Sequence, residues 1–218
     1  MSLLLFRHTP DKVVIVTDTL ATSAEGAPMR FTSKCRAVPH LGLAVAYTGI
    51  EQLGMRWTVA LDEQILSRDI EMLNDYAPEV ISRIWKDLEE EHDLRGRTST
   101  IYHFGLSERT GQYVGFAYRS AHSFVPDPIP HGFGVKPPLA VMDGFTAPED
   151  LPDWIALATA VRAEQDALAL EDRVFVGGAL TLTMLEDGVS VTSEIHRFDD
   201  FDDVWNEMNY NNLLKRGG

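Results

Sequence analysis

The sequence predicts an α+β fold in which antiparallel sheets pack against helices. Short apolar segments typical of strands occur in runs, at the start of the chain and again after residue 98. Two stretches with helical periodicity follow one another directly, between residues 50 and 91. Because strands and helices are segregated and do not alternate one by one, a doubly wound fold is disfavoured. We expect two packed antiparallel sheets between helical layers.

The first fifty residues read mainly as short, buried strands. Residues 3–6 and 12–17 are apolar and flank a Thr9-Pro10-Asp11 turn, which together predict a hairpin. Residues 30–38 form a weaker strand candidate. Residues 42–49 are small or β-branched and end at Gly49, which predicts another buried strand.

Two helices follow. Across residues 50–68 the apolar positions recur at near-helical intervals: Leu53, Trp57, Leu61 and Ile65. Pro78 is a typical first-turn residue, and the positions after it repeat at the spacing of one buried stripe: Val80, Ile81, Ile84 and Leu88. We expect these two adjacent amphipathic helices to form one layer.

The second half of the chain predicts hairpins separated by a helix. Residues 98–107 and 111–120 flank Glu108-Arg109-Thr110 as a hairpin. Residues 123–138 are rich in Pro and Gly and predict a loop with at most a short strand, a typical place for a functional segment. Helix-start residues near Pro148 predict a helix up to residue 170. Residues 173–198 predict a long hairpin that turns at residues 186–188, and residues 203–214 predict a closing helix.

Composition limits the class of protein. The 218 residues carry a formal net charge of −14, which disfavours nucleic-acid binding because phosphate contacts need clustered Lys and Arg. The single cysteine, Cys35, fits a reducing compartment. Neither a signal-peptide pattern nor an apolar run long enough for a membrane span occurs. We expect one cytoplasmic domain over residues 1–218, with no membrane partner.

Common cofactor and metal motifs do not occur. No P-loop pattern occurs, and residues 131–136 lack the Rossmann spacing. The seven histidines show no zinc-ligand spacing, and a nucleophile elbow of the G-x-S-x-G type does not occur. We therefore expect no cofactor and no metal.

Four residues suggest a different kind of chemistry. If Met1 is removed, as is usual before a small second residue, Ser2 carries a hydroxyl and an α-amine on one residue. An α-amine titrates near pH 8 and can act as the general base for that hydroxyl. Asp18 and Lys34 follow at intervals of sixteen residues, each near the end of a strand candidate. Gly49 offers a backbone N–H just before a helix, where an oxyanion is favoured.

Each of these residues alone has an ordinary explanation. A serine at position 2 is commonplace, Asp18 could be a turn residue, and Lys34 could be solvated. With Asp18 and Lys34 both at these intervals, the functional and the ordinary interpretation of the set stay open side by side.

These segments resemble a known family. VVIVTDTLATS (residues 13–23) and SKCRAVPHLGLAVAYTG (residues 33–49) look like the first half of the proteasome-type N-terminal nucleophile (Ntn) hydrolases, as a distant bacterial relative. The resemblance implies a four-layer αββα sandwich of two antiparallel sheets. It implies catalytic roles for Ser2, Asp18 and Lys34, with the Gly49 N–H as oxyanion donor. It also implies a homo-oligomer, in the form of a ring in some members.

Three positions depart from the family pattern. Active members usually carry a G-S-G turn where this chain has residues 132–134 (GFG), and an Asp and a Ser before the late Gly-Gly where it has residues 173–178 (RVFVGG). A basic residue often found two positions after the strand-end Asp is Leu20 here. Three hypotheses follow: a hydrolase of peptides or small amides with Ser2 as nucleophile, a catalytically inactive subunit acting in assembly or binding, and a ligand-binding protein that uses residues 123–138.

Overall fold

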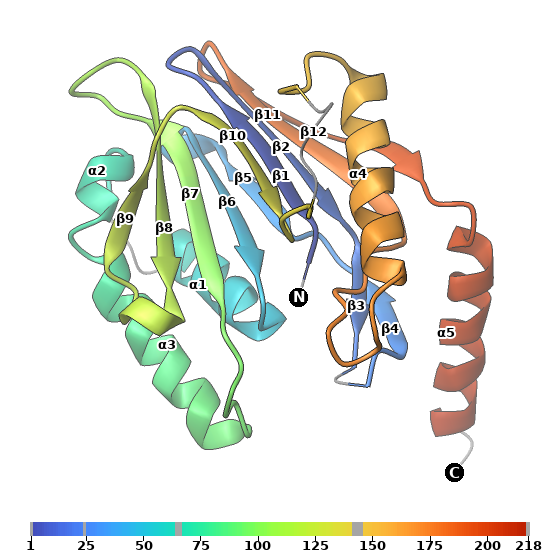
Figure 1. Ribbon diagram of the computed structural model, residues 1–218. Helices are drawn as coiled ribbons and strands as arrows, with labels where there is room; N and C mark the ends of the chain where they lie inside the picture. The colour runs from blue at the N-terminus through green and yellow to red at the C-terminus, as the bar shows by residue number, and fades with distance from the viewer. Residues whose placement is uncertain (1, 24, 64–66, 141–145, 217–218) are drawn as a thin grey trace.

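The computed structural model describes residues 2–23, 25–63, 67–140 and 146–216, with side chains described as far as Tyr210. Antiparallel sheets flanked by helices form the core of this part of the chain (Figure 1). The predicted α+β class with antiparallel sheets is therefore confirmed. None of the described helices is both long and apolar enough to cross a membrane.

The first sheet has the strand order β10-β1-β2-β11-β12, with every pair antiparallel. Its strands are β1 (Leu4–His8), β2 (Lys12–Asp18), β10 (Gly132–Lys136), β11 (Ala179–Glu186) and β12 (Val189–Arg197). The hairpins expected at residues 3–17 and 173–198 are thus present. Strand β11 pairs with β2, so the late hairpin extends the sheet that the N-terminal hairpin begins.

The second sheet has the order β5-β6-β7-β8-β9, also antiparallel. Its strands are β5 (Cys35–Val38), β6 (Leu43–Thr48), β7 (Thr100–Leu106), β8 (Tyr113–Arg119) and β9 (Pro126–Ile129). A separate two-stranded sheet pairs β3 (Leu20–Thr22) with β4 (Pro28–Phe31). The single strand expected at residues 30–38 is therefore wrong, because these residues belong to two strands in two different sheets.

The loop expected at residues 123–138 is also wrong. This segment forms β9 at the edge of the second sheet and β10 at the edge of the first, so it crosses between the sheets. Prolines are tolerated in β9 because an edge strand leaves one side of its backbone without ladder partners. Gly134 lies where a Cβ atom would be 2.3 Å from the Phe6 ring, so a larger residue would not fit against β1.

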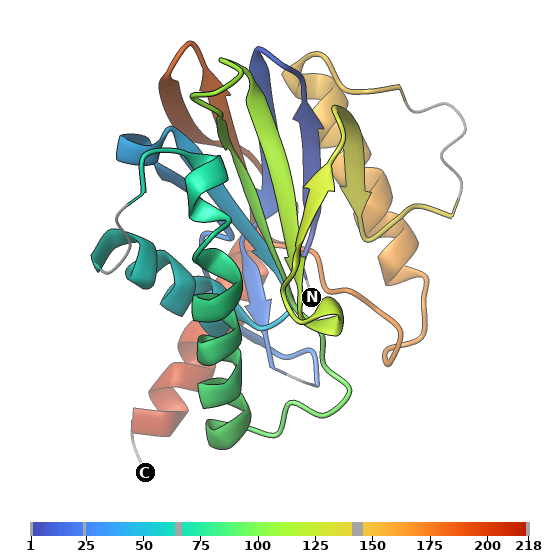
Figure 2. The ribbon, with the colours of Figure 1, turned by 90° about the vertical axis from the view of Figure 1, so that its left-hand side faces the viewer.

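Helices flank both sheets (Figures 1 and 2). They are α1 (Glu51–Glu63), α2 (Ile70–Leu73), α3 (Ala77–Glu91), α4 (Leu151–Asp166) and α5 (Phe201–Arg216). The first helix ends at Glu63 in the described residues, and Ile65 lies outside them. Helix α4 begins later than expected, because the Asp150 side chain caps it by accepting a hydrogen bond from Asp153 N (3.1 Å).

Three apolar clusters hold these elements together. One lies between the second sheet and α1 to α3, and another lies between the first sheet and α4. The third lies between the sheets and contains Leu4, Val13 and Ile15. Because neighbouring strand residues point to opposite faces, Leu3 and Leu5 join the α4 cluster while Leu4 joins the third. This alternation explains why the N-terminal strands are apolar on both faces.

Among the histidines, His103 has a structural position. It is fully buried in β7 and accepts a hydrogen bond at Nε2 from Trp57 Nε1 (2.7 Å). Burial lowers the pKa of His103 to about 3, so the ring is neutral near pH 7. The Trp57–His103 contact joins α1 to the second sheet.

Candidate active site

The four residues singled out in the sequence lie at the ends of adjacent strands. Ser2 comes just before β1, and Asp18 is the last residue of β2. The antiparallel register pairs Leu4 with Thr17, which brings the start of β1 beside the end of β2. Lys34 directly precedes β5, and Gly49 directly follows β6. The fold therefore brings all four to one end of the two sheets.

Asp18 is the centre of the hydrogen-bond network. Its side chain is fully buried (0% exposed). Oδ1 accepts from Leu3 N (3.0 Å) and from Lys34 Nζ (2.7 Å), while Oδ2 accepts from Gly177 N (3.2 Å). A buried carboxylate is costly unless it is paired and hydrogen-bonded, and these three donors satisfy that requirement.

Lys34 is held in one position. The residue is 3% exposed, and its ammonium donates both to Asp18 Oδ1 and to the carbonyl oxygen of Leu20 (2.6 Å). Leu3 N and Lys34 Nζ bind the same carboxylate oxygen, so the ammonium lies next to the backbone that joins Ser2 to Leu3. A positive charge here stabilises the deprotonated hydroxyl and the neutral amine of a neighbouring residue.

The local backbone requires a glycine at position 49. Its φ is +98°, and a Cβ atom at this position would lie 2.2 Å from the Thr98 carbonyl oxygen. Tyr47 N, two residues earlier, donates to Lys34 O (3.1 Å). Gly49 therefore lies two residues beyond the position in β6 that pairs with Lys34. None of the described residues accepts a hydrogen bond from Gly49 N, so this donor is available to a bound group.

A cleft of about 560 Å³ opens over these residues. Ser2, Lys34 and Gly49 line it, and Ser2 is 8% exposed. The other walls come from β3 and β4, the start of α1, residues 96–98 and residues 170–175. Charged side chains among the lining residues are Arg30, Lys34, Glu51, Arg97, Glu171 and Arg173.

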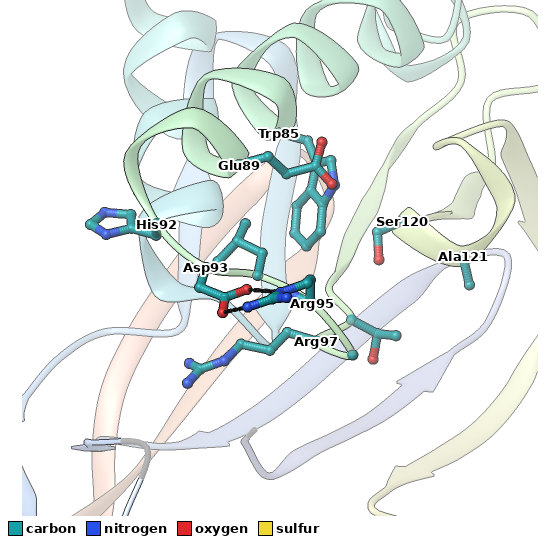
Figure 3. Close-up of a pocket in the computed structure, with 11 residues that line it drawn as sticks. Trp85, Glu89, His92, Asp93, Arg95, Arg97, Ser120 and Ala121 are labelled. Atoms are coloured by element: carbon teal, nitrogen blue, oxygen red, sulfur yellow. Dashed lines mark hydrogen bonds and ion pairs between the residues drawn. The ribbon is translucent and has the colours of Figure 1, made fainter.

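A second hollow adjoins the cleft (Figure 3). It lies between the end of α3, the loop that leads to β7, and Ser120 with Ala121. Gly96, Arg97 and Thr98 line both the hollow and the cleft. The α3–β7 loop is therefore the wall between them.

The positions that depart from the family pattern have different outcomes. The β1–β10 register places Gly132 opposite His8 and Gly134 opposite Phe6, whereas the start of β1 at Leu4 faces Lys136. The match of residues 132–134 to a turn beside the nucleophile is therefore wrong. Residues 141–145, which follow later in the chain, lie outside the described residues. Leu20 takes part through its carbonyl oxygen, which needs no basic side chain.

Sequence reasoning missed the role of Gly177, which donates to Asp18 from a segment 159 positions away. A Cβ atom at Gly177 would lie 2.9 Å from Leu20 Cδ2, so a small residue is favoured there. The Gly-Gly pair at positions 177–178 was the one available signal for this close approach. Arg173 lines the cleft and donates to the carbonyl oxygens of Asp166 (2.5 Å) and Leu168 (3.1 Å).

The described residues contain no group of three or more His, Cys, Asp or Glu side chains placed to hold a metal ion. The expectation of a site without a metal or cofactor stays a prediction.

Solved structures of similar fold cover almost the whole chain. Anbu from Hyphomicrobium sp. strain MC1 aligns with a TM-score of 0.59 at 13% identity, covering 100% of this chain and 96% of that one. Anbu from Yersinia bercovieri, described as an ancestral β-subunit, aligns with a TM-score of 0.62 at 9% identity, covering 99% of this chain and 96% of that one. The Anbu complex from Pseudomonas aeruginosa, described as a helical assembly, aligns with a TM-score of 0.62 at 12% identity, covering 98% of this chain and 96% of that one. Neither a family model nor a curated protein matches the sequence.

These comparisons correct the family that the sequence suggested. The solved structures compared above are Anbu proteins, which are proteasome-like but form a family distinct from the proteasome-type hydrolases named above. At 9 to 13% identity the likeness shows a shared fold and no more.

Proposed function

We propose that this protein is an N-terminal nucleophile hydrolase that cleaves amide bonds in peptides or small amides. The proposal requires Ser2 to be the first residue of the mature chain, because the mechanism uses its free α-amine. The observation that carries it is the buried Lys34 ammonium, which Asp18 holds beside the backbone of Ser2 in the wall of an open cleft.

In the proposed reaction, Ser2 Oγ attacks the carbonyl carbon of the substrate while its α-amine takes the hydroxyl proton. The proton then passes to the leaving amine as the C–N bond breaks, which leaves an ester between Ser2 and the acyl group. Water attacks this ester, with the α-amine again as the base, and releases the acid. Ser2 is regenerated with its proton.

The neighbouring residues support this chemistry. The Lys34 charge favours the deprotonated form of the Ser2 hydroxyl and the neutral form of its amine, so the amine can accept a proton. Asp18 is a positioning residue, because it fixes Lys34 and does not touch the substrate. The free Gly49 N–H donates to the oxyanion of the tetrahedral intermediate.

Several wider features belong to the same proposal. We propose that residues 1–218 form one domain with the four-layer αββα arrangement, and that the chain works in the cytoplasm as a homo-oligomer, with no nucleic acid or membrane partner. The P. aeruginosa Anbu complex is described as a helical assembly, which supports self-association of a chain with this fold.

Substitution of Ser2 tests the proposal. We expect Ser2→Ala to reduce hydrolysis of a fluorogenic peptide amide by about 1,000-fold or more, because nucleophile and general base act as a unit. Ser2→Thr should retain activity because it keeps the hydroxyl and the amine. Unchanged hydrolysis in Ser2→Ala would refute the proposal. Absence of hydrolysis in every variant, with Met1 retained on the mature chain, would favour the inactive subunit.

A further inference from the structure

The cleft beside Ser2 is lined by more cationic than anionic side chains, although the protein as a whole is strongly negative. The whole chain carries a formal net charge of −14. The cleft lining, in contrast, holds four cationic side chains and two carboxylates: Arg30, Lys34, Arg97 and Arg173 against Glu51 and Glu171. A concave surface of one sign concentrates ligands of the opposite sign.

Most of these cations already have partners. Arg30 binds Glu51 through two hydrogen bonds (2.6 and 3.4 Å), and Lys34 binds Asp18. Arg173 binds carbonyl oxygens and lies 3.7 Å from an Asp166 oxygen. The hydrogen-bond donors of these three side chains are therefore already bound to acceptors within the protein.

Arg97 is different. Its guanidinium makes no ion pair or hydrogen bond with any of the described side chains, and the residue is exposed at the boundary of the cleft. Asp93, the nearest carboxylate along the chain, is bound by Arg95 through two hydrogen bonds (2.8 and 2.6 Å). Figure 3 shows these two bonds and shows Arg97 with none to the other residues drawn. The Arg97 donors are thus available to a ligand.

The loop that carries Arg97 is attached to the oxyanion donor. Ser99 Oγ accepts a hydrogen bond from Ile50 N (2.7 Å), directly after Gly49. The Thr98 carbonyl lies against Gly49, as its 2.2 Å separation from a hypothetical Gly49 Cβ shows. Ser99 N also donates to Ser120 Oγ (3.0 Å), which fixes the loop on its other side. Arg97 therefore precedes a segment that is fixed against Gly49, and it lines the same cleft as Ser2 and Gly49.

We infer that the cleft selects substrates with a carboxylate close to the scissile amide, and that Arg97 determines this specificity by binding that carboxylate. The inference rests on the proposed function, because it takes the cleft beside Ser2 as the substrate site. A glutamate or aspartate side chain on the residue that supplies the scissile carbonyl has this chemistry. The planar guanidinium binds such a group through two parallel hydrogen bonds.

Binding to the full-length Ser2→Ala chain tests the inference without turnover. The probes are two matched N-acetylated peptides, one ending in a glutamate amide and the other in the isosteric glutamine amide. We expect the glutamate peptide to bind about 10- to 100-fold more tightly, because a charge-assisted hydrogen bond replaces a neutral one. Arg97→Gln should abolish the difference, and Arg97→Lys should restore part of it. Arg83→Gln is the control, because Arg83 is an exposed cation that pairs with Glu79 on α3 and does not line the cleft.

Equal dissociation constants for the two peptides, or no binding of either, would overturn the inference. So would a preference that survives Arg97→Gln or is lost in Arg83→Gln. Hydrolysis of the corresponding fluorogenic substrates by the unmodified chain separates this result from the proposed function. Equal hydrolysis of both substrates would leave the hydrolase standing without the specificity. Selective binding without any hydrolysis would leave the anion site standing without the chemistry.

Discussion

Asp18 receives hydrogen bonds from three separate segments of the chain. Leu3 lies at the start, Lys34 lies before β5, and Gly177 lies 159 positions after Asp18. This explains why an apolar strand ends on a carboxylate: the side chain joins the first strand, the candidate active-site lysine and the segment before β11. One buried group thus connects folding to the proposed chemistry.

Removal of the lysine charge should affect both stability and activity. In Lys34→Met the Asp18 carboxylate loses its counter-ion, so we expect a loss of about 3 kcal/mol or more in the free energy of unfolding. Hydrolysis should fall by about 100-fold or more, because the Ser2 amine and hydroxyl lose the neighbouring charge. Denaturant unfolding and initial rates measure the two effects.

The matched control is Lys12→Met. Lys12 also pairs with a carboxylate, Glu186, at 3.0 Å, but both side chains are about two-fifths exposed (39% and 42%). An exposed pair contributes about 0 to 1 kcal/mol, and this one lies at the opposite end of β2 from Asp18. Full activity in Lys34→Met, or a stability loss no larger than in Lys12→Met, would contradict the account.

At the residue scale, the sequence predicted side chains better than backbone groups. The two intervals of sixteen residues, from Ser2 to Asp18 and from Asp18 to Lys34, pointed to both residues, and the structure joins them. The Leu20 carbonyl and the Gly177 amide were not predicted as ligands of this pair. Every residue except proline carries both backbone groups, so no residue type marks the ones that will be used.

At the scale of the element, strand β6 ends where its backbone turns at Gly49. Gly49→Ala should destabilise the chain by about 3 kcal/mol or more, because a Cβ there overlaps the Thr98 carbonyl and the φ of +98° is strained for alanine. It should also reduce hydrolysis by displacing the oxyanion donor. Thermal unfolding and initial rates test both.

Gly111→Ala provides the comparison for backbone strain alone. Gly111 has a φ of +67° in the β7–β8 turn, and a Cβ there meets no atom within 4 Å. We expect this change to cost about 1 to 2 kcal/mol and to leave activity unchanged. Equal effects of the two substitutions would show that the close approach to Thr98 is unimportant.

Elements marked by a clear apolar period or turn signal were predicted well, and strands that depend on pairing with neighbouring strands were not. The apolar stripe after Pro78 predicted α3, and the Glu186-Asp187-Gly188 turn predicted the β11–β12 hairpin. Strands β9 and β10 were missed, because Pro126, Pro128 and the two glycines of β10 carry turn signals. Their strand conformation comes from pairing with β8 and β1, which local propensity does not contain.

At the scale of the whole molecule, the sequence predicted the class of fold but not the strand order. The order β10-β1-β2-β11-β12 brings together strands from the start, the middle and the end of the chain. The apolar pattern of residues 3–6 and 12–17 predicted short buried strands, and Leu3 to Leu5 and Val13 to Val16 are buried. It could not show which strands lie next to them, because that depends on contacts distant in sequence.

The charge distribution is also a property of the whole molecule. A formal net charge of −14 disfavoured nucleic-acid binding, whereas the cleft gathers four cations from segments spread between residues 30 and 173. Total charge describes solubility and long-range repulsion, and it does not describe a single concave site.

The most direct test of the central claim is the intact mass of the full chain purified from its own host, before and after exposure to a β-lactone. We predict a mass that lacks Met1 and gains one covalent adduct, which peptide mapping places on Ser2 and which is absent in Ser2→Ala. A chain that retains Met1 and gains no adduct would contradict the claim that Ser2 is an N-terminal nucleophile.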